Sequence, residues 1–287
     1  MRVKSINILF FCFICSNFVL SQNNYGVGKF YDDSFTKERK VLSREPVRGA
    51  DVIWETKIWR MIDFRERFNQ FFYYPLEKEG IEDRKNLVYT VWNAILNGEI
   101  TVFEDDEFKI PIDNELLKRR YTKIDTLWLE IEDEEGITDY QAVIVPKDFN
   151  SEDIYQLKLK EIWYLDKEVS TISVQIIGMA FVMQDIRVDD EGEYELRGNV
   201  TLFWVPFMSE SVKNLLANNY VYRDYNLAVL PSWEQIFYTR YFNSFIIRED
   251  NIHNRYINDY LLGMDALKEA ERIETTIFEM EIDMWDY

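Results

Sequence analysis

Apolar side chains recur at nearly every second position between Asp153 and Phe207, and this pattern constrains the fold more than any other feature of the chain. The recurring residues are Leu157, Leu159, Ile162, Tyr164, Ile172, Val174 and Ile176. A period of two predicts strands. The tetrapeptide 189–192, Asp-Asp-Glu-Gly, has the composition of a turn between two such strands, 171–187 and 194–207. We therefore predict an antiparallel sheet.

Apolar residues spaced three and four apart predict helices before and after these strands. The expected ranges are Ile53 to just before Pro75, Arg84–Asn97, Asn114–Arg120, Ser209–Leu216, Ser232–Arg248 and Met264–Trp285, with a short strand at Ile100–Phe103. Gly98 follows the second of these helices and suits its C-terminal end. The order of helices, then strands, then helices predicts the α+β class, with a central antiparallel sheet or meander flanked by N-terminal and C-terminal helices.

The first 21 residues have the features of a secretory signal peptide. Arg2 and Lys4 precede an almost continuous apolar run from Ile6 to Phe18, and Ser21 followed by Gln22 offers a cleavage point. The apolar run is shorter than the ~20 residues that span a bilayer. We therefore predict export and cleavage between Ser21 and Gln22.

Two further segments follow the predicted cleavage point. Residues 22–49 are polar and show no period, which predicts a flexible arm, and residues 50–287 are expected to form a single α+β domain. Both cysteines, Cys12 and Cys15, lie in the predicted signal peptide, so we expect the mature chain to be stabilised by apolar burial rather than by disulfides.

The formal net charge of −19 restricts the classes of partner. A field of that sign repels nucleic acid phosphates and anionic lipid headgroups, which argues against both as charge-driven ligands. A cationic protein partner fits this charge. A soluble surface without such a partner fits it equally well.

Few residues of the sequence point to catalysis, and we predict no catalytic, cofactor-binding or metal-binding residues. His253 is the only histidine and lies in a predicted loop, where a solvated side chain is the usual state. The glycine motifs of a serine-hydrolase elbow or a nucleotide-binding loop do not occur. Carboxylates are abundant, so a carboxylate-dependent glycan hydrolase or a glycan-binding module remains the alternative function. The acidic runs 130–135 and 189–193 lack the spacing of an EF-hand and are expected to be solvated turns.

Two groups of residues are candidate partner contacts. Met284, Trp285 and Tyr287 are large side chains near a terminus, where chains fray unless something holds them. Arg65 and Arg67 are expected on a charged helix face, free to pair with Asp63 and Glu66 or with a partner.

Five segments resemble the GldN family, also called PorN, of the Bacteroidetes type IX secretion system. They are IWRMIDFRERFNQFFYYP (58–75), KEIWYLDKEVSTISVQIIGMA (160–180), LFWVPF (202–207), FYTRYFNSFIIRED (237–250) and GMDALKEAERIETTIFEMEIDMWDY (263–287). No single motif is diagnostic, but their order and spacing are specific.

The resemblance implies a non-enzymatic structural subunit of the secretion and gliding motility machinery. It implies a periplasmic protein without a membrane span of its own, associated with the outer membrane through a GldK/PorK-like lipoprotein in an oligomeric ring. It further implies contact with the periplasmic domain of a GldM/PorM-like motor subunit. The resemblance transfers no catalytic residues and no cofactor.

Overall fold

The computed structural model describes residues 41–42, 47–82, 84–121, 123–132, 138–147, 149–188, 194–223 and 230–285. The predicted signal peptide with its cleavage point at Ser21 and Gln22, most of the 22–49 arm, the 189–193 turn and Tyr287 lie outside this part of the chain.

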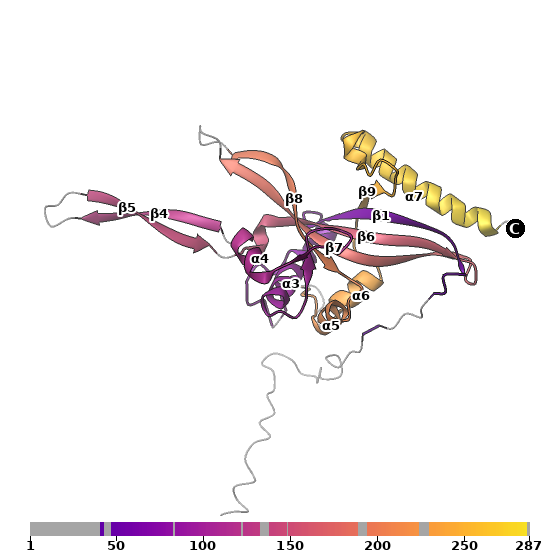
Figure 1. Ribbon diagram of the computed structural model, residues 1–287, viewed down its shortest axis with the longest axis horizontal. Helices are drawn as coiled ribbons and strands as arrows, with labels where there is room; N and C mark the ends of the chain where they lie inside the picture. The colour runs from indigo at the N-terminus through magenta and orange to yellow at the C-terminus, as the bar shows by residue number, and fades with distance from the viewer. Residues whose placement is uncertain are drawn as a thin grey trace, which may run out of the picture. The chain divides into compact units, whose positions relative to one another are not determined.

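A seven-stranded antiparallel sheet forms the centre of the fold (Figure 1), and it confirms the predicted α+β class. Its strand order is β3-β2-β8-β7-β6-β1-β9. The strands are β1 (Val52–Asp63), β2 (Val102–Phe103), β3 (Pro111–Ile112), β6 (Ile154–Asp166), β7 (Thr171–Val188), β8 (Tyr194–Pro206) and β9 (Phe245–Glu249). Consecutive strands β6, β7 and β8 are neighbours, which is the meander that the period of two predicts.

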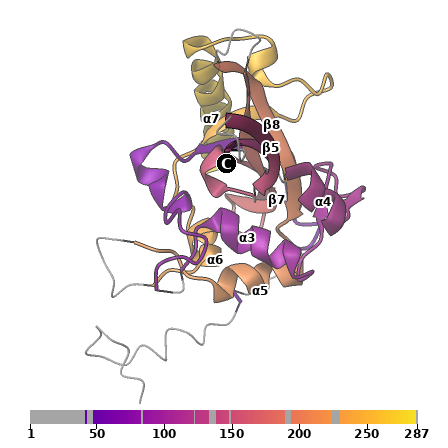
Figure 2. The same ribbon diagram turned by 90° about the vertical axis from the view of Figure 1, so that its left-hand side faces the viewer.

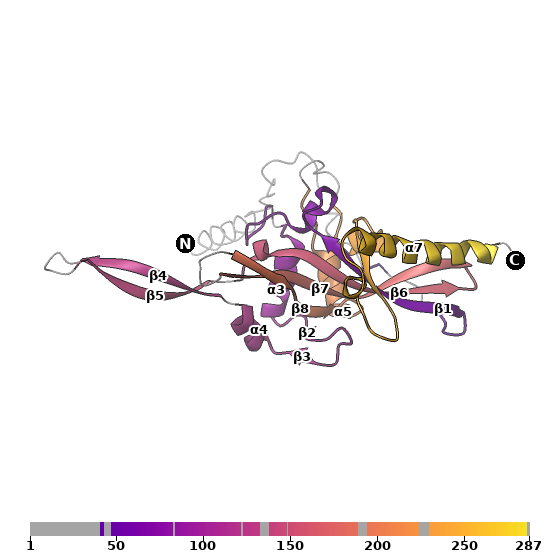
Figure 3. The same ribbon diagram turned by 90° about the horizontal axis from the view of Figure 1, so that it is seen from above.

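A second, two-stranded sheet pairs β4 (Lys123–Glu132) with β5 (Thr138–Lys147), as Figure 3 shows. This hairpin is not among the predicted elements. The alternation of Leu127, Leu129 and Ile131 with polar or aromatic residues is the signal in the sequence that indicates its first strand.

The described helices are α3 (Leu87–Leu96), α4 (Asn114–Tyr121), α5 (Glu210–Asn218), α6 (Trp233–Tyr238) and α7 (Met264–Trp285), with short 3-10 turns η1 (Arg67–Phe72), η2 (Ser151–Asp153) and η3 (Ile257–Asp259). Helices α3, α4, α5 and α7 confirm predictions. Asn86 caps α3 by accepting a hydrogen bond from the Tyr89 N–H at 2.8 Å, and Gly98 follows its end with a φ of 73°.

Two predicted helices are wrong. The expected helix from Ile53 is β1, a strand that pairs with β6 along its whole length and with β9 at residues 58–61. Side chains 52–57 of β1 alternate between partly buried and exposed, but residues 58–62 are all buried, so the second half of the strand does not show a period of two. The expected helix Ser232–Arg248 ends at Tyr238, and β9 follows after Arg240, whose φ of 51° turns the chain.

The main hydrophobic core lies between the sheet and α3, α5 and α6, which gather on one side of it in Figures 1 and 2. Phe72 is fully buried there, and its ring lies 5.5 Å from that of Trp233 and 5.8 Å from that of Phe237. A separate cluster joins α7 to β1 and β9. Trp233, Phe237 and Phe242, all in the segment predicted as one helix, thus serve in core packing.

Candidate interaction surfaces

Helix α7 attaches to the sheet through one apolar stripe. Ala266, Ala270, Ile273 and Ile277 are buried at spacings of four, three and four, against Ile58 of β1 and Ile246 of β9. This spacing places all four side chains on one face of the helix.

Two polar contacts fix the same helix. The buried Arg60 on β1 forms an ion pair of 3.2 Å with Glu274. The Ile172 N–H of β7 donates a hydrogen bond of 3.1 Å to Glu281. The position of α7 on the sheet is therefore set by the apolar stripe 266–277, by the Arg60–Glu274 ion pair near its middle and by Glu281 near its C-terminal end.

A second apolar stripe on α7 faces solvent. Leu267, Phe278 and Ile282 are 49%, 59% and 46% exposed. Phe278 and Ile282 are four positions apart, and Leu267 lies eleven positions, or three helical turns, before Phe278, so the three share a face turned away from the buried stripe. Seven acidic and two basic residues accompany them on α7, and after Arg272 every charged residue of the helix is acidic. This outer face of α7, defined by Leu267, Phe278 and Ile282, is apolar with an acidic surround.

An apolar groove of about 450 Å³ opens near α6 and the β6–β7 pair. Its lining includes Ile162, Tyr164, Val174, Ile176, Phe207 and Phe237. Leu42 also lines the groove, and its N–H donates to Glu234 at 3.0 Å. Burial raises the pKa of the Glu234 carboxyl, and the hydrogen bond from Leu42 only partly offsets it. A short piece of the N-terminal arm therefore already lies against this groove.

A buried ion pair lies beside the groove. Glu161 on β6 is fully buried and accepts hydrogen bonds from Arg240 at 2.8 and 3.2 Å and from the Trp163 indole at 2.9 Å. Arg240 is about one-third exposed on its side chain. Three donors on one carboxylate make a satisfied structural pair rather than a free acid or base.

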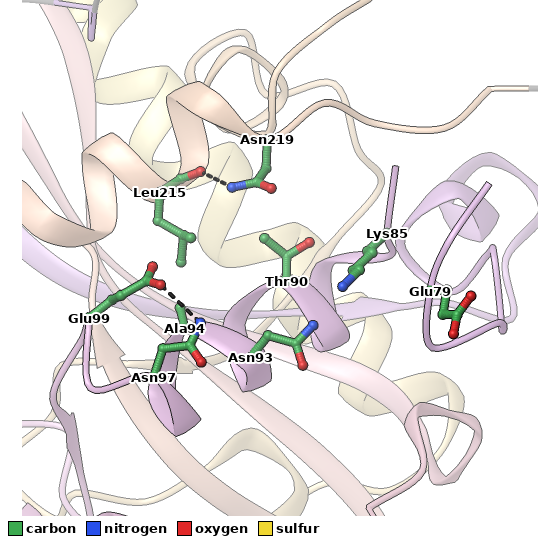
Figure 4. Close-up of a pocket in the computed structure, with 9 residues that line it drawn as sticks. All are labelled: Glu79, Lys85, Thr90, Asn93, Ala94, Asn97, Glu99, Leu215 and Asn219. Atoms are coloured by element: carbon green, nitrogen blue, oxygen red, sulfur yellow. Dashed lines mark hydrogen bonds between the residues drawn. The ribbon is translucent and has the colours of Figure 1, made fainter. Parts of the chain in front are cut away.

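A polar pocket of about 460 Å³ lies between α3 and α5 (Figure 4). Its carboxylates, Glu79 and Glu99, stand at opposite ends of the pocket in that view. Glu99 accepts a hydrogen bond from Asn97 at 3.0 Å, and Asn219 donates to the Leu215 carbonyl at 2.7 Å. Asn97, Glu99 and Asn219 thus bond to their own neighbours, and the two carboxylates of the pocket do not converge on its centre.

Metal-binding and histidine chemistry find no support in the described residues. No group of three or more histidine, cysteine or acidic residues there could hold a metal ion. His253 is exposed between β9 and η3, which confirms its predicted position in a loop. Within the same part of the chain, no helix is both long and apolar enough to cross a membrane.

The model of one protein family, the gliding motility associated protein GldN, matches residues 47–286. The chain belongs to the GldN family. The match confirms the resemblance seen in the five sequence segments and associates this protein with gliding motility. GldN is not a known enzyme family. No curated protein matches the chain.

In this GldN-family chain, the residues predicted as partner contacts are not all brought together. Met284 and Trp285 belong to the last turn of α7, and the structure does not describe their side chains. Arg65 follows the C-terminal end of β1. It donates a hydrogen bond of 2.9 Å to the Asp63 carboxylate, so one of its predicted pairings is present. Arg67 is exposed at the start of η1. The prediction that Arg65 and Arg67 share a helix face is wrong, because Arg65 lies between β1 and η1.

The outer face of α7 is not among the features predicted from the sequence of this GldN-family chain. Ile273 and Ile277 belong to the buried stripe of this helix. Phe278 and Ile282 provide a second stripe. The signal for it in the sequence is a pair of large apolar residues, four positions apart, that do not fit the first stripe.

Proposed function

We propose that this GldN-family protein is a non-enzymatic structural subunit of the type IX secretion and gliding motility machinery. In this proposal the chain is exported by the signal peptide 1–21 and acts in the periplasm as a single domain, 50–287. It assembles into a ring with a GldK/PorK-like outer-membrane lipoprotein and contacts a GldM/PorM-like motor subunit. Family membership supports the association with gliding motility, and the partners follow from the type IX resemblance.

The observation that carries the proposal is the outer face of α7. A helix already anchored through one stripe has no need of a second exposed stripe for its own folding, and exposed apolar groups of this kind mark interaction sites. The acidic residues around Phe278 and Ile282 favour a partner surface with basic residues beside apolar ones.

One face of α7 is too small to form a stable interface with a partner by itself. A helix of 22 residues is roughly 33 Å long and 10 Å wide, so one face offers roughly 300 Å². A stable interface buries about 800 Å² on each partner. The loop before α7, with Ile252, Tyr260 and Leu262 exposed, would have to contribute part of the remainder.

The test is capture of the partners from envelope extracts by the tagged full-length chain. The double variant Phe278→Ser/Ile282→Ser is expected to lower the recovery of the lipoprotein and the motor subunit at least tenfold without changing the melting temperature. The matched control is Ile110→Ser, an equally exposed apolar residue before β3. Wild-type recovery of both partners by the double variant would contradict the role of α7, and finding the protein in the cytoplasm after cell fractionation would contradict the function itself.

A further inference from the structure

Two cations and an indole converge on one carboxylate where β1, β6 and β9 are neighbours. Lys160 of β6 lies 3.4 Å from the Asp106 carboxylate and donates to the Asp106 carbonyl at 2.6 Å. Arg248 of β9 reaches the same carboxylate at 3.3 Å. The Trp59 indole of β1 donates to it at 3.0 Å. The carboxylate of Asp106 is therefore already surrounded by donors.

Arg248 is held by aromatic rings rather than by a second anion. Its guanidinium carbon lies 3.4 Å from the centroid of the Trp59 ring and 5.0 Å from that of Tyr256. The side chain is only 8% exposed, and its buried Nε has no hydrogen-bond partner in the structure. A buried guanidinium donor without an acceptor is costly, and it marks a place where an acceptor is missing.

Lys158 is a third cation and lies at the more open side of the cluster. Its ammonium donates to the Thr201 hydroxyl at 2.9 Å and lies 5.4 Å from the centroid of the Tyr256 ring. Burial lowers the pKa of the Lys158 ammonium, and the nearby Arg248 lowers it further. Among the described side chains, none with a carboxylate lies within ion-pair distance of Lys158. Lys158, Thr201 and Tyr256 are all partly exposed, so this rim is accessible to a ligand.

The local charge balance is opposite to that of the protein. Lys160 and Arg248 share the Asp106 carboxylate, and Arg248 is the charged neighbour of Lys158. Glu107 is paired with Lys109 and also lies within electrostatic reach of Lys160. A chain of net charge −19 thus gathers three cations in one place, and one of them, Lys158, has a cation rather than a carboxylate as its charged neighbour. Uncompensated charge that is partly buried destabilises a fold, so an external anion beside Lys158 would stabilise this cluster.

We propose that Lys158, Thr201 and Tyr256 form a binding site for a carboxylate carried by an acidic side chain of a partner protein. Lys158 supplies the charge, and Thr201, whose oxygen accepts from Lys158, can donate its own hydroxyl hydrogen to the ligand. Tyr256 supplies an aromatic wall. A carboxylate fits better than a phosphate, because the surrounding negative field opposes a dianion more strongly and the Arg248 fork already contacts Asp106. The site goes beyond the proposed function and does not depend on it.

The test is a titration of the full-length chain with acetate and with a hexaglutamate peptide, at ionic strength held constant with chloride. Binding is followed through the NMR signals of the Trp59 indole N–H and the lysine side chains. We expect saturable shifts with both probes, with affinity lowered at least tenfold by Lys158→Met and unchanged by Lys57→Met, a change at an exposed lysine of β1. Thr201→Val is a second variant, which preserves the side-chain volume and is expected to weaken binding severalfold.

A purely structural cluster gives a different result. If the cluster is only structural, Lys158→Met lowers the melting temperature and leaves the acetate response as in the wild type. The proposal expects an unchanged or higher melting temperature, because the variant removes an unneutralised charge. Linear, unsaturable shifts would overturn the proposal. Tighter binding of inorganic phosphate than of hexaglutamate would also overturn it and assign the site to phosphate.

Discussion

Removal of the Arg240 side chain should show how strongly the fold depends on the Glu161–Arg240 pair. Glu161 is fully buried, and the Arg240→Met variant leaves its carboxylate with the Trp163 indole as its remaining side-chain donor. Loss of one partner from a buried ion pair costs about 3–5 kcal/mol. The retained Trp163 bond and the partial exposure of Arg240 place the expected loss near the lower end, at about 3 kcal/mol. For a protein of this size that loss lowers the melting temperature by roughly 6–12 °C.

The assay is urea unfolding, monitored by tryptophan fluorescence. The slope of the unfolding free energy against urea concentration should be the same for the variant and the wild type. Replacing both partners, as Glu161→Leu/Arg240→Met, should restore most of the stability, because no charge is then buried alone. Arg255→Met changes an exposed arginine of the β9–η3 loop and should have little effect.

The backbone of Arg240 allows a finer test of the same pair. Its φ of 51° costs a non-glycine residue about 1 kcal/mol. Arg240→Gly should therefore be less harmful than Arg240→Met by about that amount. An Arg240→Met variant within 1 kcal/mol of the wild type would refute the reasoning.

Three further changes test other parts of the fold by the same unfolding measurement. Asn86→Ala removes the α3 cap and the donor to Tyr73, Pro75 and Ser151, and should lower the free energy of unfolding by about 3 kcal/mol. A loss below about 1 kcal/mol would show that water replaces these hydrogen bonds. Gly178→Ala brings a Cβ within 2.5 Å of the Phe108 ring and should cost about 1–3 kcal/mol, unless Phe108 shifts freely. Burial alone would raise the pKa of Asp63, but hydrogen bonds from Arg65 and Gln156 hold it below its ordinary value. Its stabilising contribution is therefore present above about pH 4 and is lost as the pH falls through the lowered pKa. Asp63→Asn should be less stable than the wild type by about 1 kcal/mol at pH 6, and this deficit should shrink below pH 4; a deficit independent of pH would contradict the assignment.

The sequence predicts those elements whose local pattern agrees with their place in the fold. The β6–β8 meander shows a period of two, and α7 shows helical spacing over its whole length, so both could be predicted. β1 could not, because its second half, which lies between β6 and β9, carries mostly apolar residues at consecutive positions, and these fit a helix as well as a strand. For β9, the β-branched pair Ile246-Ile247 after Asn243-Ser244 was the available signal.

The candidate sites were harder to predict than the fold. The cation cluster joins Trp59, Asp106, Lys158 and Arg248, which lie far apart in the sequence and meet only through the order of strands in the sheet. The outer face of α7 is encoded locally, yet it becomes visible only when the buried stripe of the helix is known.

The continuous β7 strand has a mechanical consequence for a protein associated with gliding motility. β7 has 18 residues and is bonded to β6 and β8 over most of that length, whereas β9 meets β1 at four register positions. A force along β7 loads many inter-strand hydrogen bonds simultaneously, while a force that peels β9 away breaks its few hydrogen bonds one after another. The molecule should therefore transmit tension along its central strands and yield first at its edges, where β2 meets β8 at one register position and where β9 carries α7.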